Sequence, residues 1–129
     1  MKKPVISIVD DDTSVREGTV DLIQSSGFGV EAFQGADDFL NSKHLGRTSC
    51  LIADVRMPGM TGLELHERLI QTGIPIPTIL LTAYPNEKDR ERALRSGVIC
   101  YLAKPYKEED LLGCIRSALA ASDGGCGSR

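Results

Sequence analysis

Four short apolar runs of the sequence each end in a polar or charged residue. The first run ends in three consecutive acids, and the other three end in an acid, a hydroxyl and an amine: Asp10, Asp11, Asp12, Asp54, Thr82 and Lys104. Short apolar runs that are bounded by turn residues are typical of buried strands. An acid beside such a strand is costly to bury unless a cation or a hydrogen-bond donor binds it.

These residue types, once brought together, suit the transfer of a phosphoryl group. Neighbouring carboxylates repel one another unless a cation lies between them, and Mg²⁺ takes one or two carboxylates together with substrate oxygens. An aspartate can itself accept a phosphoryl group and form an aspartyl phosphate. We expect Asp54 to be this nucleophile, because the loop after it supplies a backbone carbonyl for the metal. Thr82 and Lys104 would contact the phosphoryl oxygens.

Composition and charge exclude several other classes of protein. The 129 residues suffice for one domain, and the net charge of −3 argues against nucleic-acid binding by overall electrostatic attraction. No apolar run approaches the roughly 18 residues of a membrane span. The apolar run after the basic start ends at Asp10, which is too early for a signal peptide. We therefore expect a cytoplasmic protein that contacts neither membranes nor, directly, nucleic acid.

Histidine and cysteine residues are not expected to carry the chemistry. The sequence has no Gly-rich phosphate-binding loop and no Ser-His-Asp set. Both histidines, His44 and His66, fall in predicted helices away from the strand ends, and we expect them at the surface. The four cysteines are too widely spaced for a zinc site. Cys50 and Cys100 are expected to be buried thiols, whereas Cys126 in a Gly-rich tail is expected to be free.

Strand-like and helix-like segments alternate five times along the chain. We expect strands at residues 5–9, 29–33, 50–54, 78–82 and 98–103, and a short second helix at 36–43. This alternation predicts a parallel sheet covered by helices on both faces. Because the carboxyl ends of parallel strands lie along one edge of the sheet, the polar residues of the first paragraph should meet there.

Helix starts carry recognisable capping residues. Three starts are indicated by Ser14 with Glu17, by Thr61 with Glu64, and by Asn86. Thr13 is an alternative cap for the first of these helices. The caps place three helices directly after strands, as the predicted alternation requires.

The same residues resemble the receiver domain of two-component response regulators over residues 4–121. The matching motifs are Ile8–Asp12, Asp54–Gly62, Leu81–Ala83 and Lys104–Pro105. Within that family the sequence is most similar to receivers of the FixJ type, which are usually joined to a helix-turn-helix DNA-binding domain. The resemblance implies the flavodoxin-like (CheY-like), doubly wound three-layer fold, with five parallel strands in the order 2-1-3-4-5.

Specific roles follow from the resemblance. Asp54 would accept the phosphoryl group from a sensor histidine kinase. Mg²⁺ (or Mn²⁺) would be bound directly by Asp11, mainly through water by Asp10, and also by Asp54 and the backbone carbonyl of Arg56. The remaining roles are a switch hydroxyl at Thr82, a rotating switch aromatic at Tyr101, a phosphoryl contact at Lys104 and a cis bond between Lys104 and Pro105.

The resemblance also implies how the chain acts. It would not be a conventional enzyme, but would take a phosphoryl group from a donor and lose it again at Asp54. Phosphorylation would drive a homodimer through the fourth helix, fifth strand and fifth helix, and control an output domain that binds DNA. Residues 1–121 would form the receiver domain and residues 122–129 a linker or tail, with the output domain outside this chain.

Some alternatives stay open on the sequence. The chain could be a stand-alone phosphorelay shuttle, or an interaction module that works without phosphorylation. A hydrolase with an aspartyl nucleophile would need a second acid where Arg56 stands. Asp12 extends to a triplet the acidic pair that the family needs. Tyr84 and Arg56 flank the expected path of an attacking water and so bear on the lifetime of the phosphoryl group.

Overall fold

The structure, a computed structural model, describes residues 3–43 and 45–124. Its strands are β1 (Val5–Val9), β2 (Gly29–Phe33), β3 (Cys50–Asp54), β4 (Thr78–Thr82) and β5 (Cys100–Ala103). Its helices are α1 (Thr13–Ser25), α2 (Ala36–Leu40), α3 (Gly62–Gln71), α4 (Glu87–Arg95) and α5 (Glu108–Gly124), with one 3₁₀ turn at Leu45–Arg47. Within this part of the chain no helix has the length and apolar character needed to cross a membrane.

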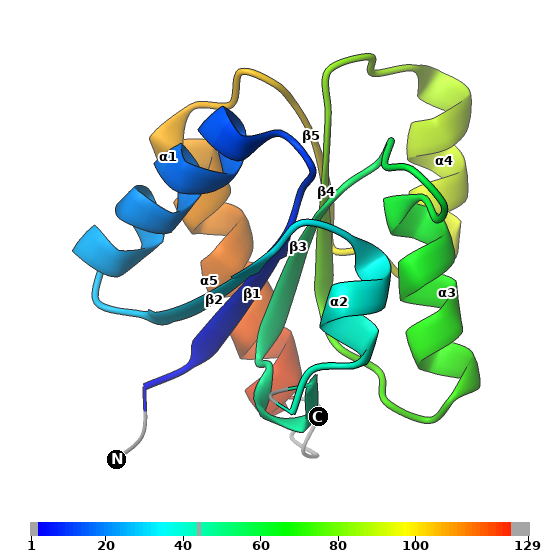
Figure 1. Cartoon of the computed structure of the whole chain (residues 1–129). Coiled ribbons are helices and arrows are strands. Elements are labelled where there is room, and N and C mark those ends of the chain that lie inside the picture. Colours follow the sequence, from blue (N-terminus) through cyan, green and yellow to red (C-terminus); the bar gives the residue numbers. More distant parts are fainter. Residues whose placement is uncertain (1–2, 44, 125–129) are drawn as a thin grey trace.

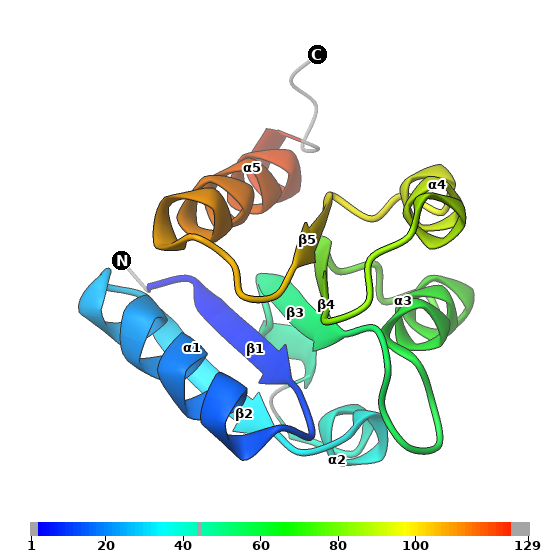
Figure 2. The same ribbon diagram turned by 90° about the horizontal axis from the view of Figure 1, so that it is seen from above.

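All five strands form one parallel sheet in the order β2-β1-β3-β4-β5. Helices α1 and α5 cover one face of the sheet, and α2, α3 and α4 cover the other (Figure 1, Figure 2). The predicted three-layer, doubly wound fold and its strand order are therefore confirmed.

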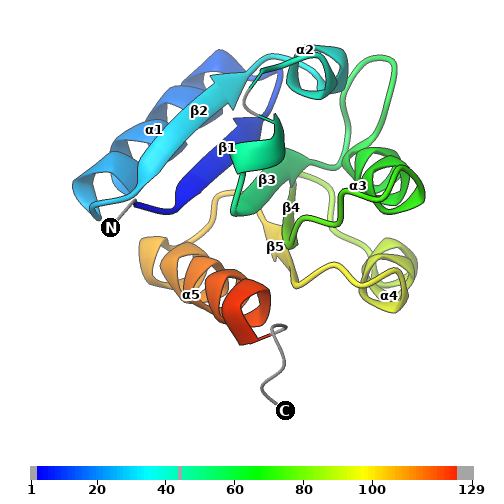
Figure 3. The same cartoon turned by 90° about the horizontal axis from the view of Figure 1, so that it is seen from below.

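The apolar core lies in two layers, one on each side of the sheet. Every residue of the central strands β3 and β4 is buried, which explains why their sequences are almost continuously apolar. One layer joins Ile52 and Ile79 to Ile115 of α5, and the other joins Leu51 and Leu80 to the helices opposite. Figure 3 shows from below how the sheet separates α5 from α3 and α4.

The start of α1 differs from the prediction. The capping residue is Asp12, whose carboxylate accepts a hydrogen bond from the backbone N–H of Val15, so the predicted caps at Thr13 or Ser14 are wrong. A carboxylate at this position satisfies a free N–H and faces the positive end of the helix dipole. The caps predicted for α3 and α4 are confirmed, with the full capping box at Thr61 and Glu64 and a cap at Asn86.

Several boundaries also move. Helix α2 ends at Leu40, three residues before the prediction. Strand β5 begins at Cys100 and not at Val98, because Val98 uses its N–H to close the end of α4 on the carbonyl of Ala93. Helix α5 runs to Gly124, past the expected start of the tail. The division of the chain at residue 121 stays a prediction, and Cys126 and His44 lie outside the described residues.

Candidate functional site

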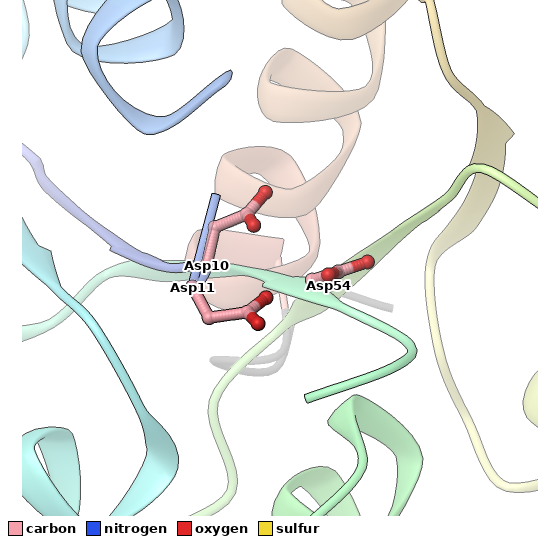
Figure 4. Close-up of side chains that lie close together, drawn as sticks. All are labelled: Asp10, Asp11 and Asp54. Carbon is pink, nitrogen blue, oxygen red and sulfur yellow. The ribbon is translucent and has the colours of Figure 1, made fainter. Parts of the chain in front are cut away.

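Three carboxylates gather at the carboxyl edge of the sheet (Figure 4). Asp10 and Asp11 follow β1, and Asp54 is the last residue of β3. One oxygen of each carboxylate lies within 4.8 Å of the others. Val9 pairs with Ala53 across the two strands, so the residues that follow them leave the sheet side by side. Asp10 and Asp54 are buried, whereas Asp11 is exposed.

Lys104 brings one amine to the same carboxylates. Its Nζ donates to Asp10 Oδ2 at 3.0 Å and lies 3.4 Å from Asp54 Oδ1. The residue follows β5, and its backbone N–H donates to the carbonyl of Thr82, which fixes it to the end of β4. The peptide bond between Lys104 and Pro105 is cis, as the resemblance implied.

The charges at this edge do not balance. Burial raises the pKa of Asp54, and the charge of Asp10 raises it further; Lys104 and a backbone hydrogen bond from Arg56 lower it without cancelling the rise. Burial lowers the pKa of Lys104, but the hydrogen bond and charge of Asp10, with those of Asp54, outweigh burial, so the net shift is upward. One cationic amine therefore faces three carboxylates.

This excess of negative charge fits a hard divalent cation. The donors of the cluster are all carboxylate oxygens, two of them in buried residues, and Mg²⁺ and Mn²⁺ prefer oxygen ligands. A cation there would offset the repulsion between Asp10 and Asp54 that Lys104 only partly relieves. Asp10, Asp11 and Asp54 are the side chains that could hold it.

Asp54 is held in place by a close approach of α3. A Cβ atom built on Gly62 would lie 2.5 Å from the backbone oxygen of Asp54 and 2.9 Å from Cδ2 of Leu80. Only glycine therefore lets the first turn of α3 pack on the end of β3. The backbone N–H of Arg56 also helps to lower the pKa of the Asp54 carboxyl. The predicted role of the Arg56 carbonyl in metal binding stays a prediction.

The turn after β1 is fixed by two hydrogen bonds to Asp10. The backbone N–H of Asp12 donates to Asp10 Oδ1 at 2.9 Å, and Nη1 of Arg16 donates to the Asp10 carbonyl at 2.7 Å. Asp12 is thus a capping and turn residue and lies outside the carboxylate cluster. Sequence reasoning missed Arg16; its place one helical turn after Asp12 is the signal that could have found it.

The two proposed switch residues both hold the loop between β4 and α4. The Oγ1 of Thr82 accepts a hydrogen bond from the backbone N–H of Tyr84 at 3.0 Å. The hydroxyl oxygen of Tyr101 accepts one from the backbone N–H of Asn86 at 3.3 Å. A cavity of about 190 Å³ lies beside Tyr101, between α4 and the loop after β3. Any movement of these hydroxyls would free the start of α4.

Arg56 and Tyr84 meet above the edge of the sheet. The Arg56 guanidinium carbon lies 5.3 Å from the centroid of the Tyr84 ring, within the range of a cation–π interaction. Tyr84 is the most exposed large apolar side chain among the described residues, at 67%. This pair therefore connects the loop after β3 to the loop after β4 on the solvent side.

His66 lies at the opposite end of the sheet and was placed wrongly by the sequence. It is buried, not exposed: Nδ1 lies 2.9 Å from Thr78 Oγ1 and Nε2 lies 2.9 Å from the carbonyl of Ser96. His66 follows Leu63 by three residues and precedes Leu69 by three, so the helical period already places it on the buried stripe of α3. It joins α3 to β4 and to the end of α4.

Comparison with known proteins gives a consistent family. The profile of the response regulator receiver domain matches residues 6–116. The response regulator protein TodT of Pseudomonas putida is 41% identical over 115 residues, which are 89% of this chain and 51% of that protein. The chain thus spans about half the length of the relatives it matches.

Solved structures agree with the sequence comparison. The response regulator StyR has a TM-score of 0.88 and 41% identity, and the match covers 95% of this chain and 62% of that one. The crystal structure of FixJ-N has a TM-score of 0.83 and 30% identity, and the match covers 92% of this chain and 95% of that one.

Proposed function

The chain belongs to the response regulator receiver domain family of two-component systems, and from this premise we propose that it receives a phosphoryl group on Asp54 in the cytoplasm. The observation that carries the proposal is the position of Asp54. Its carboxylate lies within 4.8 Å of the oxygens of Asp10 and Asp11 and 3.4 Å from the amine of Lys104. This arrangement offers a nucleophile, a cation site and a counter-charge together.

In the proposed reaction a carboxylate oxygen of Asp54 attacks the phosphorus of the donor. The new oxygen–phosphorus bond forms as the bond to the leaving group breaks, and a sensor histidine kinase would supply the donor as a phosphohistidine. Lys104 already contacts Asp54 and would pair with a phosphoryl oxygen. When bound between Asp10, Asp11 and Asp54, Mg²⁺ would neutralise charge on the carboxylates and on the phosphoryl oxygens.

The phosphoryl group would then act through Thr82. It adds about −1.5 to −2 charges and three acceptor oxygens, and the Thr82 hydroxyl lies at the end of the neighbouring strand β4. Turning toward the phosphoryl group, Thr82 would release the N–H of Tyr84 that it now holds. Tyr101 would move into the space beside it and release Asn86, the cap of α4. The proposed switch would therefore change how the first turn of α4 is held.

The face formed by α4, β5 and α5 would report this change to partners. Helix α4 carries both signs of charge, with an exposed pair between Arg90 and Glu87 at 3.5 Å, and Leu94 is 39% exposed. Mixed charge around an exposed leucine suits a self-complementary contact between two copies of the chain. We propose a phosphorylation-dependent homodimer through this face, which controls a DNA-binding output domain in the parent protein.

The direct test is chemical. The protein is incubated with acetyl phosphate and Mg²⁺, reduced with borohydride, which converts an aspartyl phosphate to homoserine, and digested with trypsin. We expect the modified residue to be Asp54 in the peptide of residues 48–56. Omitting Mg²⁺, or using Asp11→Asn, should strongly reduce the modification, whereas Asp12→Asn should not.

Other outcomes would redirect the proposal. Modification of another acid would move the site, and turnover of a phosphomonoester would favour a hydrolase. Mg²⁺ binding without any modification would favour an interaction module that works without phosphorylation. A parent protein with no output domain, together with return of the phosphoryl group to a histidine, would favour a phosphorelay shuttle.

A further inference from the structure

The cavity beside Tyr101 is apolar at its base and charged at its mouth. The base is made by buried side chains of the apolar layer under α3 and α4: Val55, Leu63 and Leu80. The other lining residues are partly or fully exposed and come from the loop after β3, from α4 and from β5: Arg56, Thr61, Asp89, Arg92 and Tyr101. An apolar base with a few convergent polar groups is typical of small-molecule sites.

The size of the cavity limits its ligand to a single small ring. An apolar cavity of about 150 Å³ holds one benzene molecule, so a cavity of about 190 Å³ holds one ring with a small substituent. Tyr101 forms one wall, and an aromatic ligand can pack against the face or the edge of its ring. A longer ligand would have to displace Tyr101 or the buried leucines.

The charges at the mouth favour an anionic head group. The guanidiniums of Arg56 and Arg92 line the cavity together with one carboxylate, that of Asp89. The Asp89 carboxylate already accepts a hydrogen bond from the side-chain amide of Asn86 at 2.8 Å, and Arg56 lies against the Tyr84 ring. Arg92 has no carboxylate partner within the described part of the chain. A ligand carboxylate could therefore pair with Arg92 through two parallel N–H···O bonds.

We propose that this cavity is a binding site for a small aromatic carboxylate. The ring would lie on the buried side chains of Val55, Leu63 and Leu80, beside Tyr101. The carboxylate would pair with Arg92 at the mouth. Because the guanidinium side of the cavity is exposed, the ligand can enter from solvent without any opening of the fold.

A ligand in this cavity would oppose the proposed switch, and this part of the inference rests on the proposed function. The cavity is the space that Tyr101 would enter when Thr82 turns toward the phosphoryl group. A bound ring would fill that space and keep the Tyr101 hydroxyl on the N–H of Asn86, where it now lies at 3.3 Å. Because coupling between two binding events is reciprocal, phosphorylation of Asp54 should weaken the binding of the carboxylate.

Nuclear magnetic resonance tests the binding without any phosphorylation. The ¹⁵N-labelled full chain is titrated with benzoate in Mg²⁺-free buffer at constant ionic strength, and benzamide serves as an uncharged probe of the same shape. We expect the largest benzoate shifts at the backbone amides of Leu63, Arg92 and Tyr101. Benzamide should bind about tenfold more weakly, because it lacks the charge-assisted pair with Arg92.

Matched variants locate the ligand. Arg92→Gln should weaken benzoate binding about tenfold. Arg95→Gln removes the same charge from the same helix but does not line the cavity, and should leave the binding unchanged. Leu63→Phe should abolish the binding of both probes by filling the base of the cavity, and far-ultraviolet circular dichroism checks that each variant is folded. The proposal is overturned if the benzoate shifts are scattered over the surface, if benzamide binds equally well, or if Arg92→Gln and Arg95→Gln have the same effect.

The effect on the switch is measured separately. The benzoate titration is repeated after treatment with acetyl phosphate and Mg²⁺, and Asp54→Asn is treated in the same way as the control. We expect weaker benzoate binding in the modified native chain and no change in Asp54→Asn. Equal binding before and after modification of Asp54 would contradict the opposing effect. If Asp54 is not modified at all, the proposed function and the opposing effect fail together, whereas the first titration alone decides whether the cavity binds benzoate.

Discussion

Strand β4 begins and ends with a buried threonine, and the two hydroxyls are used differently. Thr78 Oγ1 lies 2.8 Å from the carbonyl oxygen of Ile76 and 2.9 Å from Nδ1 of His66, so its hydroxyl has two buried hydrogen-bonding partners. Thr82 accepts one hydrogen bond from Tyr84. Within the described part of the chain, no acceptor is recorded for the Thr82 proton.

The same contrast holds for the other polar groups at the two ends of the sheet. At the Thr78 end, the buried side chains of Thr78 and His66 have hydrogen-bonding partners. At the Thr82 end, three carboxylates lie together and the one amine of Lys104 pairs with two of them, while the Thr82 hydroxyl has no recorded acceptor in the described part of the chain. Buried polar groups whose hydrogen bonds are all satisfied stabilise a single folded structure, whereas a cluster of incompletely neutralised charges favours the binding of a counter-ion or ligand. We therefore expect substitutions at the Thr78 end of the sheet to lower stability, and substitutions at the Thr82 end to impair function.

The largest effect should come from Asp54→Asn. This variant should lose all modification by acetyl phosphate, yet its free energy of unfolding in Mg²⁺-free buffer should rise. The rise is expected because burial and the charge of Asp10 disfavour the ionised Asp54, as its raised pKa indicates. Mass spectrometry and urea unfolding measure the two effects. A less stable, unlabelled variant would mean that Asp54 is needed for folding and would weaken the contrast.

The next largest effect is the difference in the free energy of unfolding between Thr78→Val and Thr82→Val. Thr78→Val should lower the free energy of unfolding by about 2–3 kcal/mol, because His66 and the Ile76 carbonyl both lose a buried partner. Thr82→Val should cost about 1 kcal/mol or less, because Tyr84 is exposed and its N–H can turn to water. Urea unfolding of both variants at pH 7 gives the comparison. Equal losses would show that the two hydroxyls are equivalent.

A smaller effect is expected from Mg²⁺. At a concentration ten times its dissociation constant, the ion should raise the free energy of unfolding by about 1.4 kcal/mol if it binds only the folded chain. Thermal unfolding with and without Mg²⁺ measures the gain, and excess EDTA should remove it. Thr78→Val should keep the gain and Asp11→Asn should lose it, since only the second change touches the carboxylate cluster. A gain in Asp11→Asn equal to that of the native chain would place the ion elsewhere.

The smallest predicted effect is a pH dependence at Cys50. Its pKa is raised from 9.0 to about 12, mainly by burial, so its neutral thiol contributes stability below pH 9 that is lost as the pH rises toward 12. Between pH 8 and 9.5 the native chain should lose about 1 kcal/mol relative to Cys50→Ala. Urea unfolding under a reductant, at both pH values, measures this difference. Parallel losses in the two proteins would assign the pH dependence to other groups.

Much of the site was predictable because of how parallel strands end. The alternation of strands and helices by itself places Asp10, Asp54, Thr82 and Lys104 at one edge of the sheet, and the structure brings the two acids and the amine into contact. The roles given to Thr82 and Tyr101 stay predictions. The cap at Asp12 was missed because an acid after a strand can serve either a metal site or a helix start, and only the backbone geometry distinguishes them.

By itself the sequence determined the class of fold, the order of its elements and the identity of the acidic edge, because hydrophobic periodicity and turn residues are local signals. Tertiary structure alone decided which groups from distant segments meet. It joined His66 to Thr78 and Ser96, and it placed Cys50, Cys100 and Cys114 in one apolar layer between the sheet and α5. These contacts depend on how α3 and α5 pack on the sheet, and packing is a property of several segments at once.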